Sequence, residues 1–271
     1  MSEHIAFIGG GNMATAMISG LKSQGFPVQQ IDVVEPFFEA QARLKSQFNI
    51  EARPKAGAFL ERASIVIWAV KPQSFADATQ LVHPHSRNAL HISVAAGIPS
   101  SSIAKWLGTQ RVIRTMPNTP ALIGKGITGL FARPAVTEAD RDHAERIIQG
   151  MGEFLWLESE EQLDAVTALS GSGPAYMFYL MEAMTEAGFQ MGLTRAQACQ
   201  LAIATFVGAG ELARSSQEPP EILRQRVTSK GGTTYAAICS MDESGIKERF
   251  TKALFAAHQR AGELGAEFGK S

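Results

Sequence analysis

In the first half of the chain, short apolar runs alternate with segments whose apolar positions recur at helical spacing. Apolar runs bounded by turn residues predict strands, and they lie at residues 5–8, 31–35, 65–70, 90–95 and 112–115. Helices at 13–23, 39–47 and 138–149 and further strands at 127–131 and 154–157 complete the predicted elements. This rhythm is typical of a parallel, doubly wound sheet with helices on both faces. We expect this α/β domain to occupy residues 1–161.

The second half of the chain carries almost no strand pattern. Its apolar positions recur at helical spacing, which predicts helices at 174–191, 195–214, 219–227, 233–243 and 246–266. The helix at 174–191 is apolar on nearly all sides, so it is buried either in a larger core or against a second chain. We therefore expect an all-helical domain at residues 162–271.

Composition and charge narrow the function classes. Hydrophobic residues make up 45% of the chain, which is ample for a buried core. The net charge is −1, so the sequence predicts neither a nucleic-acid partner nor an anionic membrane surface. Cys199 and Cys239 have no metal-ligand spacing around them, so we expect no metal site and no disulfide scaffold. With no signal-peptide pattern at the N-terminus, we expect a cytoplasmic protein.

A glycine-rich motif follows the first predicted strand. Gly9, Gly11 and Ala14 fit the pattern G-x-G-x-x-A, where the glycines permit a tight turn and a close backbone approach to a pyrophosphate. The start of the next helix supplies free N–H groups for the anion. A tight structural turn is the alternative, but the flanking strand, helix and second strand favour a nicotinamide dinucleotide. The expected cofactor contacts in this motif are Ile8, Gly9, Gly10, Gly11, Asn12 and Met13.

An acid ends the second predicted strand. Glu35 lies 24 residues beyond Gly11 (35 − 11), near the spacing of acids that bind the adenosine ribose hydroxyls and repel a 2′-phosphate. Glu35 is therefore a predicted cofactor contact and favours NAD over NADP. The alternative is a solvated acid in a loop.

Other expected cofactor contacts stand where later strands end, because ligands collect at the carboxyl ends of parallel strands. They are Ala69, Val70, Lys71, Pro72, Ala95, Met116, Pro117 and Asn118. For Lys71 the alternative is a solvated loop lysine. For the proline-rich segment 114–120 the alternative is a purely structural turn.

Two glycine-rich stretches interrupt the helical half, at residues 170–174 and 229–234. Each places N–H groups and hydroxyls at a helix start, which suits a carboxylate or a phosphate, although ordinary helix capping is equally compatible. None of the six histidines lies in these motifs, and no lysine occurs between Lys125 and Lys230. The scarcity of acid–base groups suits an acceptor that is already activated, such as an imine, with Tyr176 or Tyr179 as an alternative proton donor.

Taken together, these motifs resemble the pyrroline-5-carboxylate reductase family over essentially the whole chain. The segments that carry the resemblance are residues 7–14, 69–72, 116–120, 168–176 and 227–234. The resemblance implies a Rossmann-type domain followed by a helical dimerisation domain. It also implies reduction of L-1-pyrroline-5-carboxylate to L-proline by hydride transfer from NADP(H) or NAD(H), the last step of proline biosynthesis.

The resemblance also implies roles for residues of the helical half. Gly231, Gly232 and Thr233, with Gly171 and Ser172, would bind the substrate carboxylate. Thr234 would bind the ring nitrogen, so Thr234 and Ser172 are the expected catalytic residues. Met116, Pro117 and Asn118 would line the nicotinamide pocket. Two chains would form a homodimer through their helical domains, and dimers would assemble further into a decamer.

Three positions depart from the family's pattern: Lys230 replaces a common proline, Ala56 an asparagine and Glu35 a small or basic residue. They leave the choice between NADPH and NADH open. Two other functions also remain open. A 3-hydroxyacid dehydrogenase-like reductase would need a lysine in the long helix, which the chain lacks. A non-enzymatic dinucleotide sensor would not need the two anion-binding stretches.

Overall fold

The computed structural model describes residues 3–269 of the 271-residue chain. Contacts group the described residues into two compact units, one reaching to Ser172 and resuming at Ala257, the other spanning Gly173–Ala256. The sequence pattern placed a boundary at 161/162. In the structure the first unit extends to Ser172, beyond that boundary, and also includes the end of the last helix from Ala257. Leu264 and Phe268 of this helix pack against Gly97.

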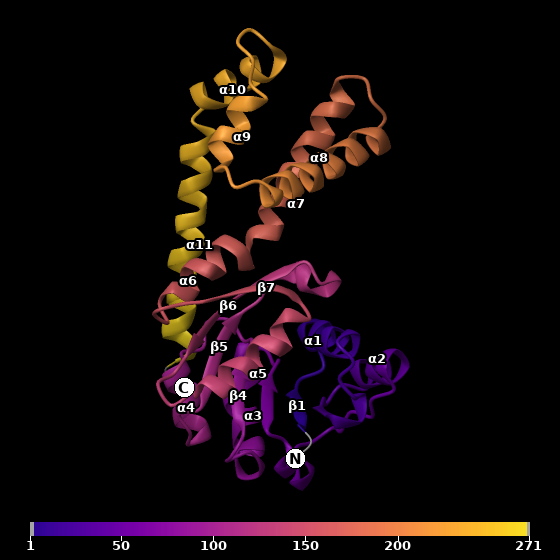
Figure 1. The fold of residues 1–271 in the computed structure, drawn as a ribbon, viewed down its shortest axis with the longest axis vertical. Coiled ribbons are helices and arrows are strands. Elements are labelled where there is room, and N and C mark those ends of the chain that lie inside the picture. Colours follow the sequence, from indigo (N-terminus) through magenta and orange to yellow (C-terminus); the bar gives the residue numbers. More distant parts are fainter. Residues whose placement is uncertain (1–2, 270–271) are drawn as a thin grey trace. The chain divides into compact units, whose positions relative to one another are not determined.

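The first unit contains one seven-stranded sheet with the order β2-β1-β3-β4-β5-β6-β7 (Figure 1). The strands are β1 (Ile5–Ile8), β2 (Ile31–Val34), β3 (Ile65–Trp68), β4 (Leu90–Ser93), β5 (Val112–Met116), β6 (Gly126–Ala132) and β7 (Gly152–Trp156). Strands β1 to β5 pair in parallel, β6 runs antiparallel to β5, and β7 runs parallel to β6. The predicted doubly wound sheet is confirmed, with a reversal at its far edge. The strand order reverses direction around β1 and β3, where such sheets bind their ligands.

Helices cover both faces of this sheet. They are α1 (Asn12–Ser23), α2 (Phe38–Phe48), α3 (Phe75–Val82), α4 (Ser100–Leu107), α5 (Glu138–Gln149) and α6 (Gln162–Val166). A π-helix (Thr167–Gly171) follows α6, and short 3₁₀ turns lie at Val28–Gln30, Ala58–Arg62, Pro72–Ser74, His83–His85 and Thr119–Ile123. The sequence pattern missed α3, α4 and α6, because these helices have eight, eight and five residues and are shorter than the window of about 11 residues over which helical periodicity is recognised.

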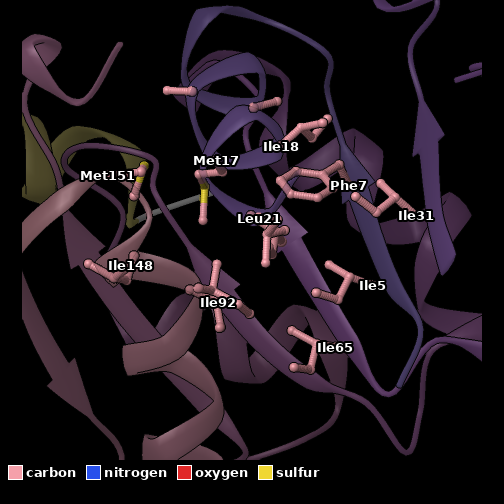
Figure 2. Close-up of a cluster of buried hydrophobic side chains, with 14 of the residues drawn as sticks. Ile5, Phe7, Met17, Ile18, Leu21, Ile31, Ile65, Ile92, Ile148 and Met151 are labelled. Atoms are coloured by element: carbon pink, nitrogen blue, oxygen red, sulfur yellow. The ribbon is translucent and has the colours of Figure 1, made fainter. Parts of the chain in front are cut away.

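Alternation along the strands divides the core into two apolar clusters. In β1, Ile5 and Phe7 point to the face covered by α1, α2 and α5, whereas Ala6 and Ile8 point to the face covered by α3 and α4. Figure 2 shows the first cluster, in which Met17, Ile18 and Leu21 of α1 pack over the strands. Because strands of this kind are buried on both faces, they appear in the sequence as continuous apolar runs.

Two glycines allow α1 and the end of α5 to touch backbone to backbone. A Cβ on Gly20 would lie 2.6 Å from the carbonyl carbon and oxygen of Gly150, and a Cβ on Gly150 would lie 2.7 Å from Gly20. This close approach fixes α1, and with it the loop that precedes α1, against the rest of the unit.

The second unit is all helical, as predicted. Its helices are α7 (Gly173–Gln190), α8 (Arg195–Ser215), α9 (Pro220–Arg226), α10 (Thr233–Glu243) and the first part of α11 (Ile246–Phe268). Helix α8 begins at a capping box, in which the Thr194 hydroxyl accepts from Gln197 N and the Gln197 side chain accepts from Thr194 N. Gly188 of α7 packs tightly on Ala198 of α8, since a Cβ on Gly188 would lie 2.8 Å from the Ala198 Cβ.

Helix α7 buries none of its residues in the single chain, although it is apolar on nearly all sides. Phe178, Tyr179, Met184 and Phe189 are all exposed large side chains of this helix. Such a concentration of apolar surface marks a site of association.

Candidate active site

The turn between β1 and α1 has the geometry of a phosphate-binding loop. Gly9 adopts φ +95°, and a Cβ there would lie 2.5 Å from the Ala69 carbonyl oxygen, so only glycine fits. Gly11 forms the N-cap of α1 without a side-chain hydrogen bond, and a Cβ on Gly11 would meet no atom within 4 Å. The start of α1 therefore leaves room beside Gly11 for the close approach of a pyrophosphate to the helix N-terminus.

Glu35, the acid at the end of β2, is buried against this loop. Its Oε2 accepts a hydrogen bond of 2.7 Å from Gly10 N, and its Oε1 accepts one of 2.9 Å from Phe37 N. Arg43 of α2 donates from Nη2 to the Gly10 carbonyl at 3.1 Å. Two side chains of opposite charge thus hold Gly10 in place, which the sequence pattern did not indicate.

An apolar cavity of about 190 Å³ lies beside this loop, at the carboxyl ends of β1, β2 and β3. It is lined by Ile8, Gly9, Val34, Pro36, Pro54, Lys55, Ala56, Val70, Ser74, Ala78, Leu81 and Val82. The position and the apolar lining fit the adenosine end of a dinucleotide. Ala56, where the resemblance leads us to expect an asparagine, therefore stands in the cavity wall.

The segment after β3 reaches the loop through its backbone. Ala69 donates from N to the Ile8 carbonyl at 2.8 Å, and its own carbonyl lies against Gly9. Lys71 is exposed and is the N-cap of the 3₁₀ turn Pro72–Ser74. Ala95, the expected contact after β4, has its side chain in the second core cluster, so only its backbone is available to a ligand.

The segment after β5 is fixed by its own hydrogen bonds. Asn118 accepts through Oδ1 from Ile127 N at 3.0 Å, so its amide group braces β6 against the turn that begins after it. Met116, at the end of β5, packs on the π-helix: a Cβ on Gly171 would lie 2.5 Å from the Met116 Cε. The structure therefore brings an expected nicotinamide contact next to an expected substrate contact. Ser172, which follows, donates from N to the Thr167 carbonyl.

A buried charge network supports this part of the unit. Arg114 in β5 donates from Nη1 to Glu160 Oε1 at 3.0 Å. The same carboxylate accepts from the backbone N and the hydroxyl of Ser100 at the start of α4. These contacts join residues 46 and 60 positions apart in the chain, so no local pattern could have revealed them.

The second unit holds the other expected substrate contacts. Gly231 adopts φ +78° and Gly232 is the N-cap of α10 without a side-chain hydrogen bond. Thr233 and Thr234 form the first turn of α10, and Thr234 is half-buried. Helix α10 has eleven residues, so the N–H groups of its first turn lack an intrahelical partner, whereas Gly232 N in the loop donates to the Ser229 carbonyl at 3.0 Å.

Comparison with known proteins identifies the family. The chain is 44% identical to a pyrroline-5-carboxylate reductase of Pseudomonas aeruginosa over 271 residues, which covers 99% of both chains. The chain belongs to the pyrroline-5-carboxylate reductase family. The sequence profile described as pyrroline-5-carboxylate reductase dimerisation matches residues 160–264 of this reductase homologue. A second profile, described as NADP oxidoreductase coenzyme F420-dependent, matches residues 4–97.

Solved structures agree with this assignment of the chain to the reductase family. A pyrroline-5-carboxylate reductase from Coxiella burnetii has a TM-score of 0.90 at 37% identity and covers 97% of this chain and 99% of its own. A Plasmodium falciparum pyrroline carboxylate reductase with NADP bound has a TM-score of 0.86 at 24% identity over 97% and 98% of the two chains, a likeness of fold. The described part of the chain contains no helix long and apolar enough to cross a membrane.

Proposed function

We propose that this chain reduces L-1-pyrroline-5-carboxylate to L-proline with a hydride from NADPH or NADH. The observation that carries the proposal is the 44% identity over nearly the full length of a named pyrroline-5-carboxylate reductase. The glycine loop supports it independently, because Gly9 and Gly11 have the conformations and the free space that a dinucleotide needs.

The chemistry divides between the cofactor and the chain. The reduced nicotinamide supplies a hydride to the imine carbon, and the ring nitrogen carries the proton that makes the product a secondary amine. The loop at Gly231 and Gly232 and the N–H group of Thr233 at the start of α10 hold the carboxylate, since a helix start attracts an anion. Thr234 hydrogen-bonds the ring nitrogen and so fixes which face of the imine receives the hydride.

Two substitutions at one position test this assignment. The Thr234→Ala variant is expected to lower kcat by at least about tenfold, the cost of one positioning hydrogen bond, while the Kd of the cofactor is unchanged. The Thr234→Ser variant keeps the hydroxyl and is expected to retain most of the activity. The absorbance of the reduced nicotinamide measures the turnover of wild type and of both variants. Wild-type protein that consumes neither cofactor with the pyrroline substrate would refute the proposed function, and unchanged turnover in the alanine variant would remove Thr234 from the mechanism.

Two chains pair through their helical domains in this proposal. The dimerisation profile covers residues 160–264, and α7 exposes Phe178, Tyr179, Met184 and Phe189 in the single chain. Dimers assemble further into a decamer in the cytoplasm, where the free thiols of Cys199 and Cys239 remain reduced. Light scattering after size exclusion should give the mass of ten chains. A Phe178→Asp variant should weaken the dimer, and a monomeric wild-type protein would contradict the pairing.

The two other candidate functions have weaker support. A 3-hydroxyacid dehydrogenase-like enzyme would need a proton-transfer lysine in the long helix, and residues 174–191 contain none. The chain also resembles a prephenate dehydrogenase, but at 13% identity this is a likeness of fold alone. A dinucleotide sensor would not need the loop before α10. The relatives at 44% and 38% identity are both named pyrroline-5-carboxylate reductase.

A further inference from the structure

We propose that Glu35 makes this enzyme prefer NADH, because its carboxylate fills the position that the 2′-phosphate of NADPH would otherwise take. The inference rests on the proposed function for the identity of the cofactor and adds which of the two dinucleotides the site selects. It starts from the two hydrogen bonds of the Glu35 side chain.

Two backbone N–H groups from separate segments converge on one anion. Gly10 N, in the glycine loop, lies 2.7 Å from Glu35 Oε2, and Phe37 N, in the turn after β2, lies 2.9 Å from Oε1. Such a pair of N–H groups is a binding site for an anionic group. Here the protein's own carboxylate occupies it, so neither N–H group is available to a phosphate.

The carboxylate is also held where it is. Glu35 is 5% exposed, and its own carbonyl accepts from Gln41 Nε2 at 2.6 Å. Its backbone N donates to the Arg53 carbonyl at 2.8 Å. These contacts hold the Glu35 carboxylate in place, so an incoming 2′-phosphate would meet it, and the two negative charges would repel each other in a partly desolvated site.

The turn after β2 offers nothing to offset this repulsion. Residues 36–42 read Pro-Phe-Phe-Glu-Ala-Gln-Ala and contain no cation and no hydroxyl group. Phe37 and Phe38 are 73% and 80% exposed, so the turn presents aromatic faces to solvent. A second acid, Glu39, lies in the first turn of α2.

Three cations lie in this neighbourhood. Arg43 donates from Nη2 to the Gly10 carbonyl, and its Nε is buried without a hydrogen-bond partner. The Arg53 guanidinium stacks on the Phe59 ring at 4.1 Å from its centroid. Lys55, in the wall of the adenosine cavity, and Arg43 are the cations that would have to bind a 2′-phosphate if the inference were wrong.

Binding of two cofactor fragments tests the inference without the pyrroline substrate. ADP-ribose and 2′-phospho-ADP-ribose differ only in the 2′-phosphate, and calorimetry on the full-length wild-type protein should give a Kd at least about tenfold lower for ADP-ribose. The ratio of kcat/KM for NADH and NADPH should favour NADH to a similar extent. Equal or tighter binding of the phosphorylated fragment would overturn the inference, and loss of that binding in Lys55→Gln would name the residue responsible.

Substitution of Glu35 makes the test specific. Glu35→Ser empties the position between the two N–H groups beside Arg43, so the preference for ADP-ribose should shrink by at least about tenfold. Glu39→Gln removes an acid from the same turn without touching Gly10 or Phe37 and should leave the ratio within about twofold of wild type. An unchanged ratio in Glu35→Ser would overturn the inference. If Glu35→Ser does not fold, the inference is decided by the Kd values of ADP-ribose and 2′-phospho-ADP-ribose on the wild-type protein. An inactive protein that still prefers ADP-ribose would refute only the proposed function, and an active protein without the preference would refute only this inference.

Discussion

The Trp68 indole Nε1 donates a hydrogen bond of 3.1 Å to Nδ1 of His91, and both side chains are fully buried. The other ring nitrogen of His91, Nε2, lies 3.2 Å from the Ser86 carbonyl oxygen. This arrangement admits only the neutral ring with its proton on Nε2, since a proton on Nδ1 would point at the indole N–H. Burial lowers the pKa of His91 to about 4, and the nearby Arg111 and His83 act in the same direction.

Stability should therefore fall as the medium is acidified from the ordinary histidine pKa of about 6.5 towards about 4. In this window the unfolded chain takes up a proton on residue 91 and the folded chain does not, so acid favours unfolding. Between pH about 6.5 and about 4, the free energy of unfolding should fall by about 3 kcal/mol. Denaturant unfolding of wild type and His91→Gln at several pH values measures it. The glutamine variant can keep both hydrogen bonds without titrating and should give a flatter profile; equal slopes would contradict the assignment.

Substitutions at Gly9 and Gly11 should separate the two uses of glycine in the loop. Gly9→Ala forces a Cβ to within 2.5 Å of the Ala69 carbonyl oxygen at a positive φ, so it should lower both the melting temperature and cofactor affinity. Gly11→Ala meets no protein atom and should leave the melting temperature unchanged while weakening NADH binding at least about tenfold. Thermal unfolding and fluorescence titration measure these effects, and normal cofactor affinity in Gly11→Ala would argue against a pyrophosphate at this position.

The contact between Gly20 and Gly150 predicts a stability effect far from the chemistry. Gly20→Ala should destabilise the protein by about 2 kcal/mol, because overpacking against backbone outweighs the gain in helix propensity. Gly262→Ala in α11 is the matched control, since its Cβ would make only an ordinary contact of 3.8 Å with Asp164. That control should be neutral or slightly stabilising in the same denaturation series. If Gly20→Ala and Gly262→Ala had the same free energy of unfolding, α1 would be able to shift away from Gly150 without a loss of stability.

The packing of Met116 on Gly171 predicts a functional coupling. Gly171→Ala should displace the Met116 thioether, because the new methyl group and the Met116 Cε cannot both fit at 2.5 Å. We expect a rise in KM or a loss of kcat with little change in stability, since the displaced atom is the end of a flexible side chain. Met116→Ala in the same protein should recover part of the loss. A double-mutant cycle on kcat/KM measures the coupling, and simple additivity would rule it out.

Patterns that lie within one segment could be read from the sequence. Strand β1 and the other buried strands of the parallel sheet were predictable because burial on both faces demands a continuous apolar run. Helix α10 was predicted with its observed bounds, since the glycine-rich loop before it marks where the helix begins. The glycine motif and the acid at Glu35 were also visible, as was the loop before α10.

The sequence by itself determined the fold class, the dinucleotide motif and the family, because each rests on residues whose spacing is local and whose backbone demands are strict. Only the tertiary structure decided what those residues touch. Gly9 needs to be glycine because of Ala69, sixty residues away, and Glu35 binds Gly10, twenty-five residues away. A hydrogen bond or a steric contact depends on ångström distances that arise when distant segments pack. For this reason Glu35 could be recognised as an acid in the right place, but its role as the anion that closes the 2′-phosphate position could be inferred only from the folded chain.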